Sequence, residues 1–126
     1  MSHITKVKTK LKDDQVLRRS LEKMGYSVIG AGQYCGRISG TIKDIEFIAS
    51  KKGERLGFKR MAGDDCYEIF ADWQEIRRGQ QDIVNGITQV YSQEKIINMA
   101  YSRGYSVITN RTNNKGQIEM VLRKVA

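Results

Sequence analysis

The sequence predicts an α+β protein: a two-layer sandwich in which a mostly antiparallel sheet carries two helices on one face. Segments that alternate with period two outnumber helical segments, in the order β-α-β-β-β-β-α-β-β. Short turns join most of the strands, which favours antiparallel pairing. The 126 residues contain no proline and no linker-like or low-complexity segment, so residues 1–126 are expected to form a single domain.

The chain begins with a predicted strand, a helix and a second strand. Residues 3–11 alternate, so that one face carries Thr5, Val7, Thr9 and Leu11 and the other carries Ile4, Lys6, Lys8 and Lys10. A helix is expected from Asp13, a favourable N-cap, to Gly25, which suits a left-handed exit from a helix. Its apolar stripe contains Val16, Leu17, Leu21 and Met24. Residues 26–31 then form the second strand.

The middle of the chain is predicted to be all strand and turn. Residues 30–36, GAGQYCG, form a glycine-rich connection and not a phosphate loop, because the third glycine comes one residue late and no helix follows. Strands are expected at 41–49, 55–60 and 66–73, with turns at 51–54 and 61–65. In the last of these strands one face carries Tyr67, Ile69, Ala71 and Trp73.

The last part of the chain repeats the helix-to-strand pattern. Residues 80–103 form a long helix with an apolar stripe of Ile83, Val84, Ile87, Val90, Tyr91, Ile97, Ala100 and Tyr101. Strands at 105–109 and 117–125 flank a hairpin turn at 113–116. The pentapeptide GYSVI occurs at 25–29 and at 104–108. It marks two equivalent joints, which arise either by duplication or by convergence on the same way of leaving a helix.

The basic charge is concentrated in the first half of the sequence. Residues 1–60 hold 14 Lys and Arg against 6 Asp and Glu, a net +8, whereas residues 61–126 hold 8 of each, a net 0. This asymmetry indicates an anionic partner, such as nucleic acid, a lipid surface or an acidic protein. The alternative is a basic face that serves only solubility.

Composition argues against several other classes of protein. No apolar run approaches the ~18–20 residues of a transmembrane helix, and the N-terminus lacks the apolar region of a secretory signal. Cys35 and Cys66 are expected to be reduced structural thiols. With His3 as the single histidine, neither a zinc site nor a catalytic triad can be assembled, so we expect no cofactor, no metal and no catalytic residues.

Candidate binding residues lie on two of the predicted strands. Lys6, Lys8 and Lys10 project from one face of the first strand, and Arg55 and Lys59 project similarly from the fourth. Aromatic residues occur nearby in sequence, at Tyr34, Phe58 and Tyr67, and lysines beside aromatic rings suit single-stranded nucleic acid. Alternating lysines also keep an edge strand from pairing with neighbours, and the sequence leaves both interpretations open.

Asp72 and Trp73 form a second candidate site at the end of the strand at 66–73. A carboxylate beside the only tryptophan, just before a glycine-containing loop, suits a partner-binding anchor. The structural alternative is a tryptophan that anchors the core and an aspartate that caps a turn. Asp64 and Asp65 lie in a predicted turn, where such residues are typical.

Several segments together resemble a known family. They are SHITKVKT, LRRSLEKMGYSV, LGFKR followed by CYEIFADW, ITQVYSQEKIINMAYSRGYSV and GQIEMVLRKV. In this order they resemble the hypothetical chloroplast reading frame thirty-five family of cyanobacteria and red-algal plastids, a domain of unknown function. The resemblance implies a small soluble protein of the cyanobacterial cytosol or plastid stroma that is not an enzyme of known type.

These observations favour a non-enzymatic accessory protein that uses its basic N-terminal half to contact an acidic protein or complex. The alternative function is binding of RNA or single-stranded DNA on a basic face of the sheet. Whether the protein self-associates is not fixed by the sequence.

Overall fold

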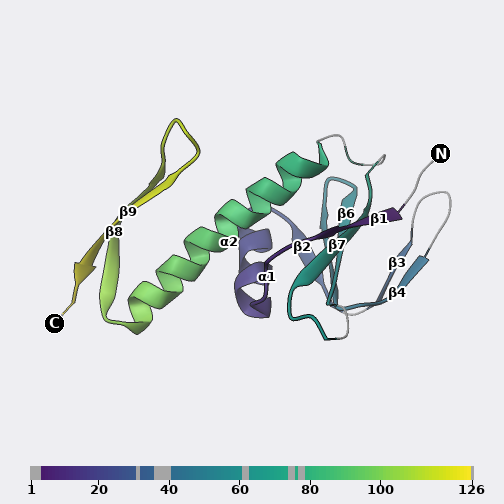
Figure 1. Cartoon of the computed structure of the whole chain (residues 1–126), viewed down its shortest axis with the longest axis horizontal. Helices are drawn as coiled ribbons and strands as arrows, with labels where there is room; N and C mark the ends of the chain where they lie inside the picture. The colour runs from purple at the N-terminus through teal and green to yellow at the C-terminus, as the bar shows by residue number, and fades with distance from the viewer. Residues whose placement is uncertain are drawn as a thin grey trace.

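The computed structural model describes residues 4–30, 32–35, 41–60, 63–73, 76 and 79–125, and for 32–35 and 41–43 the backbone alone. His3, Gly36 and the side chains of Tyr34 and Cys35 lie outside the described residues. The predicted α+β class with antiparallel pairing is confirmed (Figure 1). In chain order the elements are β1 (Ile4–Lys8), α1 (Asp14–Lys23), β2 (Ser27–Ile29), β3 (Gly32–Cys35), β4 (Thr41–Ile45), β5 (Phe47–Lys51), β6 (Glu54–Arg60), β7 (Tyr67–Asp72), α2 (Gln80–Ser102), β8 (Tyr105–Thr112) and β9 (Ile118–Lys124).

The main sheet has five strands in the order β1-β7-β6-β5-β2, and each neighbouring pair is antiparallel. Both helices contribute to one core on the same face of this sheet, as the predicted apolar stripes require. The buried members of this core are Leu11, Leu17, Leu21, Tyr26, Phe47, Ala49, Leu56, Phe58, Tyr67, Ile69, Ala71, Ile76, Ile83 and Ile87. We call this side of the sheet the core face and the opposite side the outer face.

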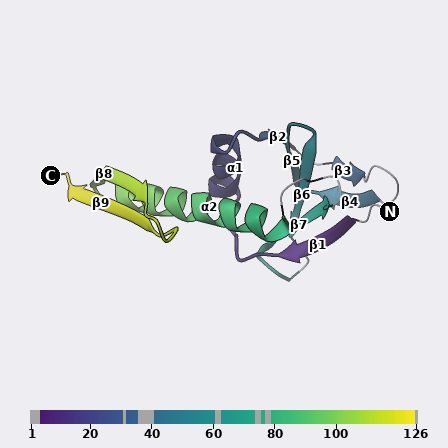
Figure 2. The same ribbon diagram turned by 90° about the horizontal axis from the view of Figure 1, so that it is seen from above.

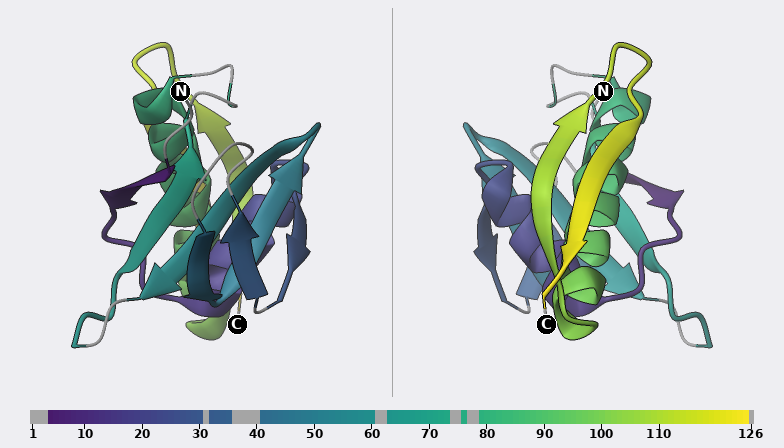
Figure 3. Two further views of the ribbon diagram at one scale, coloured as in Figure 1. Left: turned by 90° about the vertical axis from the view of Figure 1, so that its right-hand side faces the viewer. Right: turned by 90° about the vertical axis from the view of Figure 1, so that its left-hand side faces the viewer.

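The outer face carries a second, smaller core. Ile45 and Phe70 are buried there, with Ile4 and Ile48 packed against them. The β3–β4 hairpin lies in front of this side of the main sheet (Figure 3, left). Strand β7 is therefore buried along its whole length, because it is covered on both faces.

The described chain has two strands more than the sequence predicts. The expected strand at 41–49 is divided at Glu46 into β4 and β5, two residues after Asp44, which adopts a positive φ of 61° within β4. The Glu46 carboxylate fixes this break by accepting hydrogen bonds from the backbone N–H and Nη2 of Arg60, both at 2.8 Å. The additional strand β3 lies in the expected glycine-rich connection and pairs with β4.

The two helix-to-strand joints have the expected backbone geometry. Gly25 follows α1 with φ +95°, and Gly104 follows α2 with φ +81°. Such values favour glycine, because a Cβ atom there meets the neighbouring backbone. The repeated pentapeptide is thus a structural device for leaving a helix.

Strands β8 and β9 form their own two-stranded sheet and do not extend the main one. They pack along α2 toward its C-terminal end, and at the tip of the hairpin the Gly116 carbonyl accepts a hydrogen bond from Gln89 Nε2 at 3.0 Å. The C-terminal part of α2 projects beyond the main sheet, so the molecule is elongated (Figures 1 and 2). The predicted stripe on α2 is wrong at its last position, because Tyr101 is 61% exposed beyond the region that the core covers. Neither described helix has the combined length and apolarity needed to cross a bilayer.

Candidate partner-binding surface

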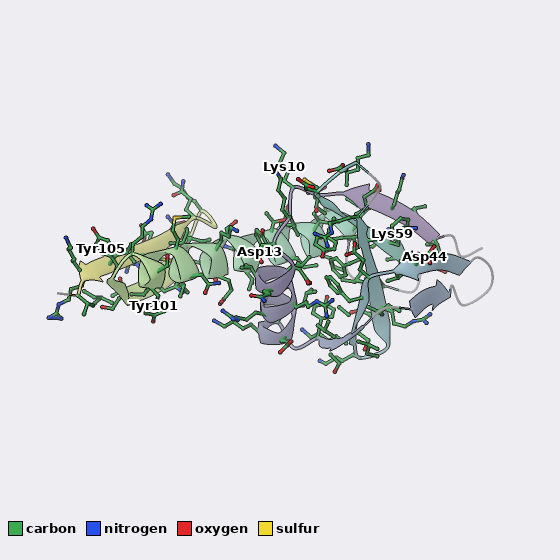
Figure 4. All side chains as sticks on the ribbon, turned by 90° about the horizontal axis from the view of Figure 1, so that it is seen from below. Lys10, Asp13, Asp44, Lys59, Tyr101 and Tyr105 are labelled. Atoms are coloured by element: carbon green, nitrogen blue, oxygen red, sulfur yellow. The ribbon has the colours of Figure 1, made fainter. Side chains whose placement is uncertain are left out.

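The predicted lysine ladder lies on the outer face at the edge of the main sheet. Lys6 and Lys8 lie on β1, opposite Phe70 and Glu68 of β7, and Lys10 follows just after the strand ends. β1 has β7 as its only neighbour in the described part of the sheet, so its other edge is unpaired. Lys8 and Lys10 are exposed, and Lys10 points away from the body of the molecule (Figure 4). We call Lys6, Lys8 and Lys10 the lysine strip.

A buried carboxylate lies among these cations. Glu68 is almost fully buried, and the backbone register places it between Lys8 of β1 and Lys59 of β6. Lys6 Nζ lies 3.5 Å from Glu68 Oε2, while neither carboxylate oxygen has a hydrogen-bond partner. A buried carboxylate without hydrogen bonds depends on nearby positive charge. Part of the positive charge of this face therefore compensates Glu68 and is not available to a partner.

Arg55 and Lys59 are confirmed to share the outer face with the lysine strip, since Leu56 and Phe58 between them are buried on the core face. Both side chains are half-buried, and both interact with other groups of the protein. The exposed cations of the candidate surface are Lys6, Lys8 and Lys10, and because Lys6 pairs with Glu68, Lys8 and Lys10 are the ones most available to a partner.

A groove begins where the lysine strip meets α2. Its lining comes from the end of β1, the following segment and the first half of α2, and consists of Lys8, Thr9, Lys10, Leu11, Val84 and Thr88. The floor is apolar and the rim carries two lysines, so the groove suits an extended segment with both apolar and acidic side chains.

The aromatic part of the nucleic-acid hypothesis is wrong for two of its three rings. Phe58 and Tyr67 are both fully buried on the core face, where Phe58 stacks on Phe47 with ring centroids 4.8 Å apart. They lie at strand positions that alternate with Lys59 and Glu68, so their rings point to the side of the sheet opposite the lysines. Neither ring is able to stack on a base.

Asp72 and Trp73 are adjacent but do not form an exposed pair. Asp72 is fully buried on the outer face opposite Ile4, and its Oδ2 has no hydrogen-bond partner. Trp73 is half-buried and packs against the main core, with its Nε1 also buried and without a partner. This geometry agrees with the structural alternative for Trp73 and leaves the Asp72 carboxylate away from the surface.

Sequence reasoning missed the buried acids Glu68 and Glu94. Glu94 lies on α2 and forms an ion pair with Lys23 of α1, which helps to hold the two helices together. Glu68 alternates with Tyr67 and Ile69, so its position on the outer face is readable from the sequence. Its position between two lysine-bearing strands is not readable, because it depends on the order of strands in the sheet.

The described residues contain no group of three or more His, Cys, Asp or Glu side chains placed to hold a metal ion. Cys66, half-buried before β7, has a free thiol. The accessible charged side chains of the lysine strip are thus cations, while the carboxylates of Glu68 and Asp72 on the same face are buried, an arrangement suited to binding an anionic group.

No curated protein and no solved structure matches this chain. A family model described as "Protein of unknown function (DUF1257)" matches residues 20–121, from the middle of α1 to the middle of β9. This match covers well over half of the chain, and we conclude that the protein belongs to that family of unknown function.

Proposed function

We propose that this protein is a non-enzymatic binding protein that contacts an acidic protein or complex through its lysine strip. The observation that carries the proposal is the position of the strip. Lys8 and Lys10 are exposed on and just beyond an edge strand, at the rim of a groove that β1 forms with α2. Arg55 and Lys59 extend the positive face across β6.

The unpaired edge of β1 is the second feature that would bind a partner, besides the charge of the lysine strip. An extended segment that adds to a sheet edge forms main-chain hydrogen bonds, and its side chains decide which sequence is accepted. The lysine strip repels a basic or identical strand and attracts an acidic one. Edge protection and partner selection are then two effects of the same lysines. Asp72 is not part of the contact surface, since its carboxylate is buried.

Binding of RNA or single-stranded DNA is the less supported alternative. The lysines suit phosphates, but the burial of Phe58 and Tyr67 removes the rings that were expected to stack on bases. The resemblance to the plastid reading-frame family would place either activity in the cyanobacterial cytosol or the plastid stroma.

Fluorescence anisotropy with two labelled probes of equal charge tests the proposal. The probes are a glutamate-rich peptide with alternating apolar residues and a single-stranded RNA, titrated at ~50 and ~200 mM salt, where counterion effects differ strongly. We expect the peptide to bind more tightly than the RNA. The variant Lys8→Glu/Lys10→Glu should weaken peptide binding at least about tenfold, because each reversal replaces attraction with repulsion. Lys6 is kept, since its Nζ lies 3.5 Å from Glu68 Oε2, and because Lys8 also lies opposite Glu68, urea unfolding checks that the double variant is folded.

Arg103→Glu/Lys115→Glu is the matched control, with the same change in charge at two exposed positions outside the lysine strip. Its affinity for the peptide should stay within about twofold of the unmodified protein. Equal losses in both double variants would show attraction by net charge alone and refute the proposed surface. Tighter binding of the RNA, lost in Lys8→Glu/Lys10→Glu, would select the alternative.

A further inference from the structure

The β8–β9 hairpin is an incomplete sheet. Its two strands pair with each other, and no other described strand joins them. One face of the hairpin packs on α2, and its other face points away from the molecule (Figure 3, right). A two-stranded sheet is marginally stable in water, and additional strands or packing stabilise it.

The large exposed apolar side chains of the described residues concentrate in the hairpin and in the second half of α2. Apart from Ile29, the large apolar side chains that are exposed among the described residues all lie between residues 96 and 125, and they are Ile96, Met99, Tyr101, Ile108, Val121, Leu122 and Val125. Exposed apolar residues gathered in one region mark an interaction surface more strongly than scattered ones do.

The free edges of the sheets differ in how they are protected. β1 carries the lysine strip, and β2 is only three residues long. β8 contains a bulge at Ile108, where its register with β9 shifts. Each of these three features disfavours pairing with the same strand of a second copy. β9 has seven residues, and its register is regular from Ile118 to Val121, so it is the least protected of these edges.

The sequence of β9 is complementary to itself in antiparallel orientation. If a second copy pairs with it about a two-fold axis at Val121, Glu119 faces Arg123 of the other copy, and this pair occurs twice. Met120 faces Leu122 twice, and Val121 faces its own counterpart. Directly opposed residues lie on the same face of a sheet, so the two pairs of opposite charges flank Val121 on one face, and Met120 meets Leu122 on the other.

We propose that β9 pairs with β9 of a second copy of this chain, forming a four-stranded antiparallel sheet in the order β8-β9-β9-β8. Charge complementarity selects a second copy as the partner, because Glu119 and Arg123 satisfy each other only in this register. Glu119 also interacts with Arg111 of its own hairpin, Nε to Oε1 at 2.9 Å, and its second oxygen remains available to the other copy. The same pairing at β1 would place lysines opposite lysines.

Light scattering during size-exclusion chromatography, over a range of protein concentrations, measures the proposed dimer. We expect a mass that rises from monomer to dimer with concentration. Val121→Lys places two cations together at the two-fold axis and should abolish the dimer. Ile29→Lys is the matched control: Ile29 is 60% exposed and Val121 53%, and both lie on edge strands, so the control should leave the dimer unchanged.

A charge exchange separates the proposed register from a general effect on folding. Arg123→Glu places Glu119 opposite a glutamate twice in each dimer and should raise the dimer dissociation constant about tenfold. The double variant Glu119→Arg/Arg123→Glu restores opposite charges across the interface and should recover part of that loss, since it also removes the ion pair between Glu119 and Arg111 within the hairpin. A protein that stays monomeric at every concentration overturns the proposal. So does a dimer that is insensitive to Val121→Lys, or a double variant weaker than Arg123→Glu.

Discussion

At the scale of single residues, Tyr67 combines full burial with a hydroxyl that has no hydrogen-bond partner. Phe47 and Phe58 contact its ring edge-on, and the Arg60 guanidinium lies over its face, 4.7 Å from the centroid. Burial raises the pKa of Tyr67 to about 12, with nearby Glu46 adding to this effect. The tyrosine thus stabilises the core through its ring, whereas its hydroxyl has little compensation for the loss of water.

Tyr67→Phe is therefore expected to change stability in a pH-dependent way. Because the pKa of Tyr67 is raised in the folded state, the free energy of unfolding of the unmodified protein does not depend on this group below the unfolded pKa of ~10. That free energy falls as the pH rises from ~10 to ~12, since the unfolded chain then loses the phenol proton more readily. Urea unfolding near pH 8 should show the variant equal to the unmodified protein or more stable by about 1 kcal/mol. Near pH 11 its advantage should grow, because only the unmodified protein must keep a buried phenol neutral.

Tyr101→Phe is the control for this experiment, since Tyr101 is exposed. It should follow the unmodified protein at both pH values. A variant Tyr67→Phe that loses as much stability in alkali as the unmodified protein would contradict the assigned role of burial.

Alternation in the sequence predicted which face of a strand each residue occupies, but not what covers that face. Lys6, Arg55 and Lys59 lie on the outer face as their strand positions indicate. The burial of Asp72 depends on cover from outside the main sheet, and a period-two pattern carries no information about a second layer. For the same reason, the sequence did not show that Glu68 lies buried among cations.

At the scale of elements, the start of α1 is fixed by contacts with α2. Asp13 caps α1 by accepting a hydrogen bond from the backbone N–H of Val16 at 3.1 Å, and it pairs with Lys95 of α2 at 3.2 Å. The backbone N–H groups of Lys12 and Asp13 donate to the Tyr91 hydroxyl of α2 at 3.3 and 3.0 Å. Asp13, labelled in Figure 4, thus takes part both in the cap of α1 and in the contact between α1 and α2.

Asp13→Ala is expected to cost about 1 kcal/mol at neutral pH, as loss of an N-cap usually does. The hydrogen bond from Val16, assisted by Lys95, lowers the pKa of Asp13 below its usual 3.8. A lowered carboxylate pKa stabilises the folded state above the unfolded pKa, and this contribution is lost as the pH falls through the folded pKa. The cost measured by urea unfolding should therefore shrink between pH ~7 and pH ~3.

Asp13→Asn separates the cap from the charge. Asparagine retains an acceptor for the Val16 N–H but loses the attraction to Lys95, so the variant should lie between alanine and the unmodified protein at neutral pH. Its deficit relative to the unmodified protein should disappear in acid. A cost for Asp13→Ala that is the same at both pH values would show that the carboxylate charge contributes nothing.

Helix boundaries were more predictable from the sequence than strand boundaries. Asp13, Gly25 and Gly104 carry strong local preferences, and the structure uses each of them at the expected helix end. The division of residues 41–49 was not predictable, because it depends on a positive φ at Asp44 and on hydrogen bonds between Glu46 and the distant Arg60. A continuous alternating segment gives no sign of such a break.

At the scale of the whole molecule, the length of α2 explains the elongated shape. A helix of 23 residues is ~35 Å long, which exceeds what the main sheet covers. The buried members of the main core all lie between Leu11 and Ile87, so the C-terminal half of α2 projects past them and packs against β8–β9. The sequence predicted the helix and the hairpin, but the apolar stripe continues to residue 101 and gave no indication of where the core ends.

Because the β8–β9 hairpin lies outside the main core, we expect two levels of local stability within one chain. Segments with few buried contacts open at lower free energy than the core, and their amides exchange faster. In hydrogen exchange at low protein concentration, we expect the amides of β8 and β9 to exchange at least about tenfold faster than those of β5, β6 and β7, since each factor of ten corresponds to ~1.4 kcal/mol of opening free energy. Equal protection along the chain would refute a weakly held hairpin.

Hydrogen exchange at high protein concentration shows which strand edge takes part in self-association. Self-association through β9 should slow the exchange of β9 amides, while the amides of β1 should be unaffected by concentration, because the lysine strip keeps two β1 edges apart. An acidic peptide added at low concentration should give the opposite result, with protection at β1 and none at β9. Protection of both strands by either treatment would mean that the two surfaces act together, against the separate roles proposed for them.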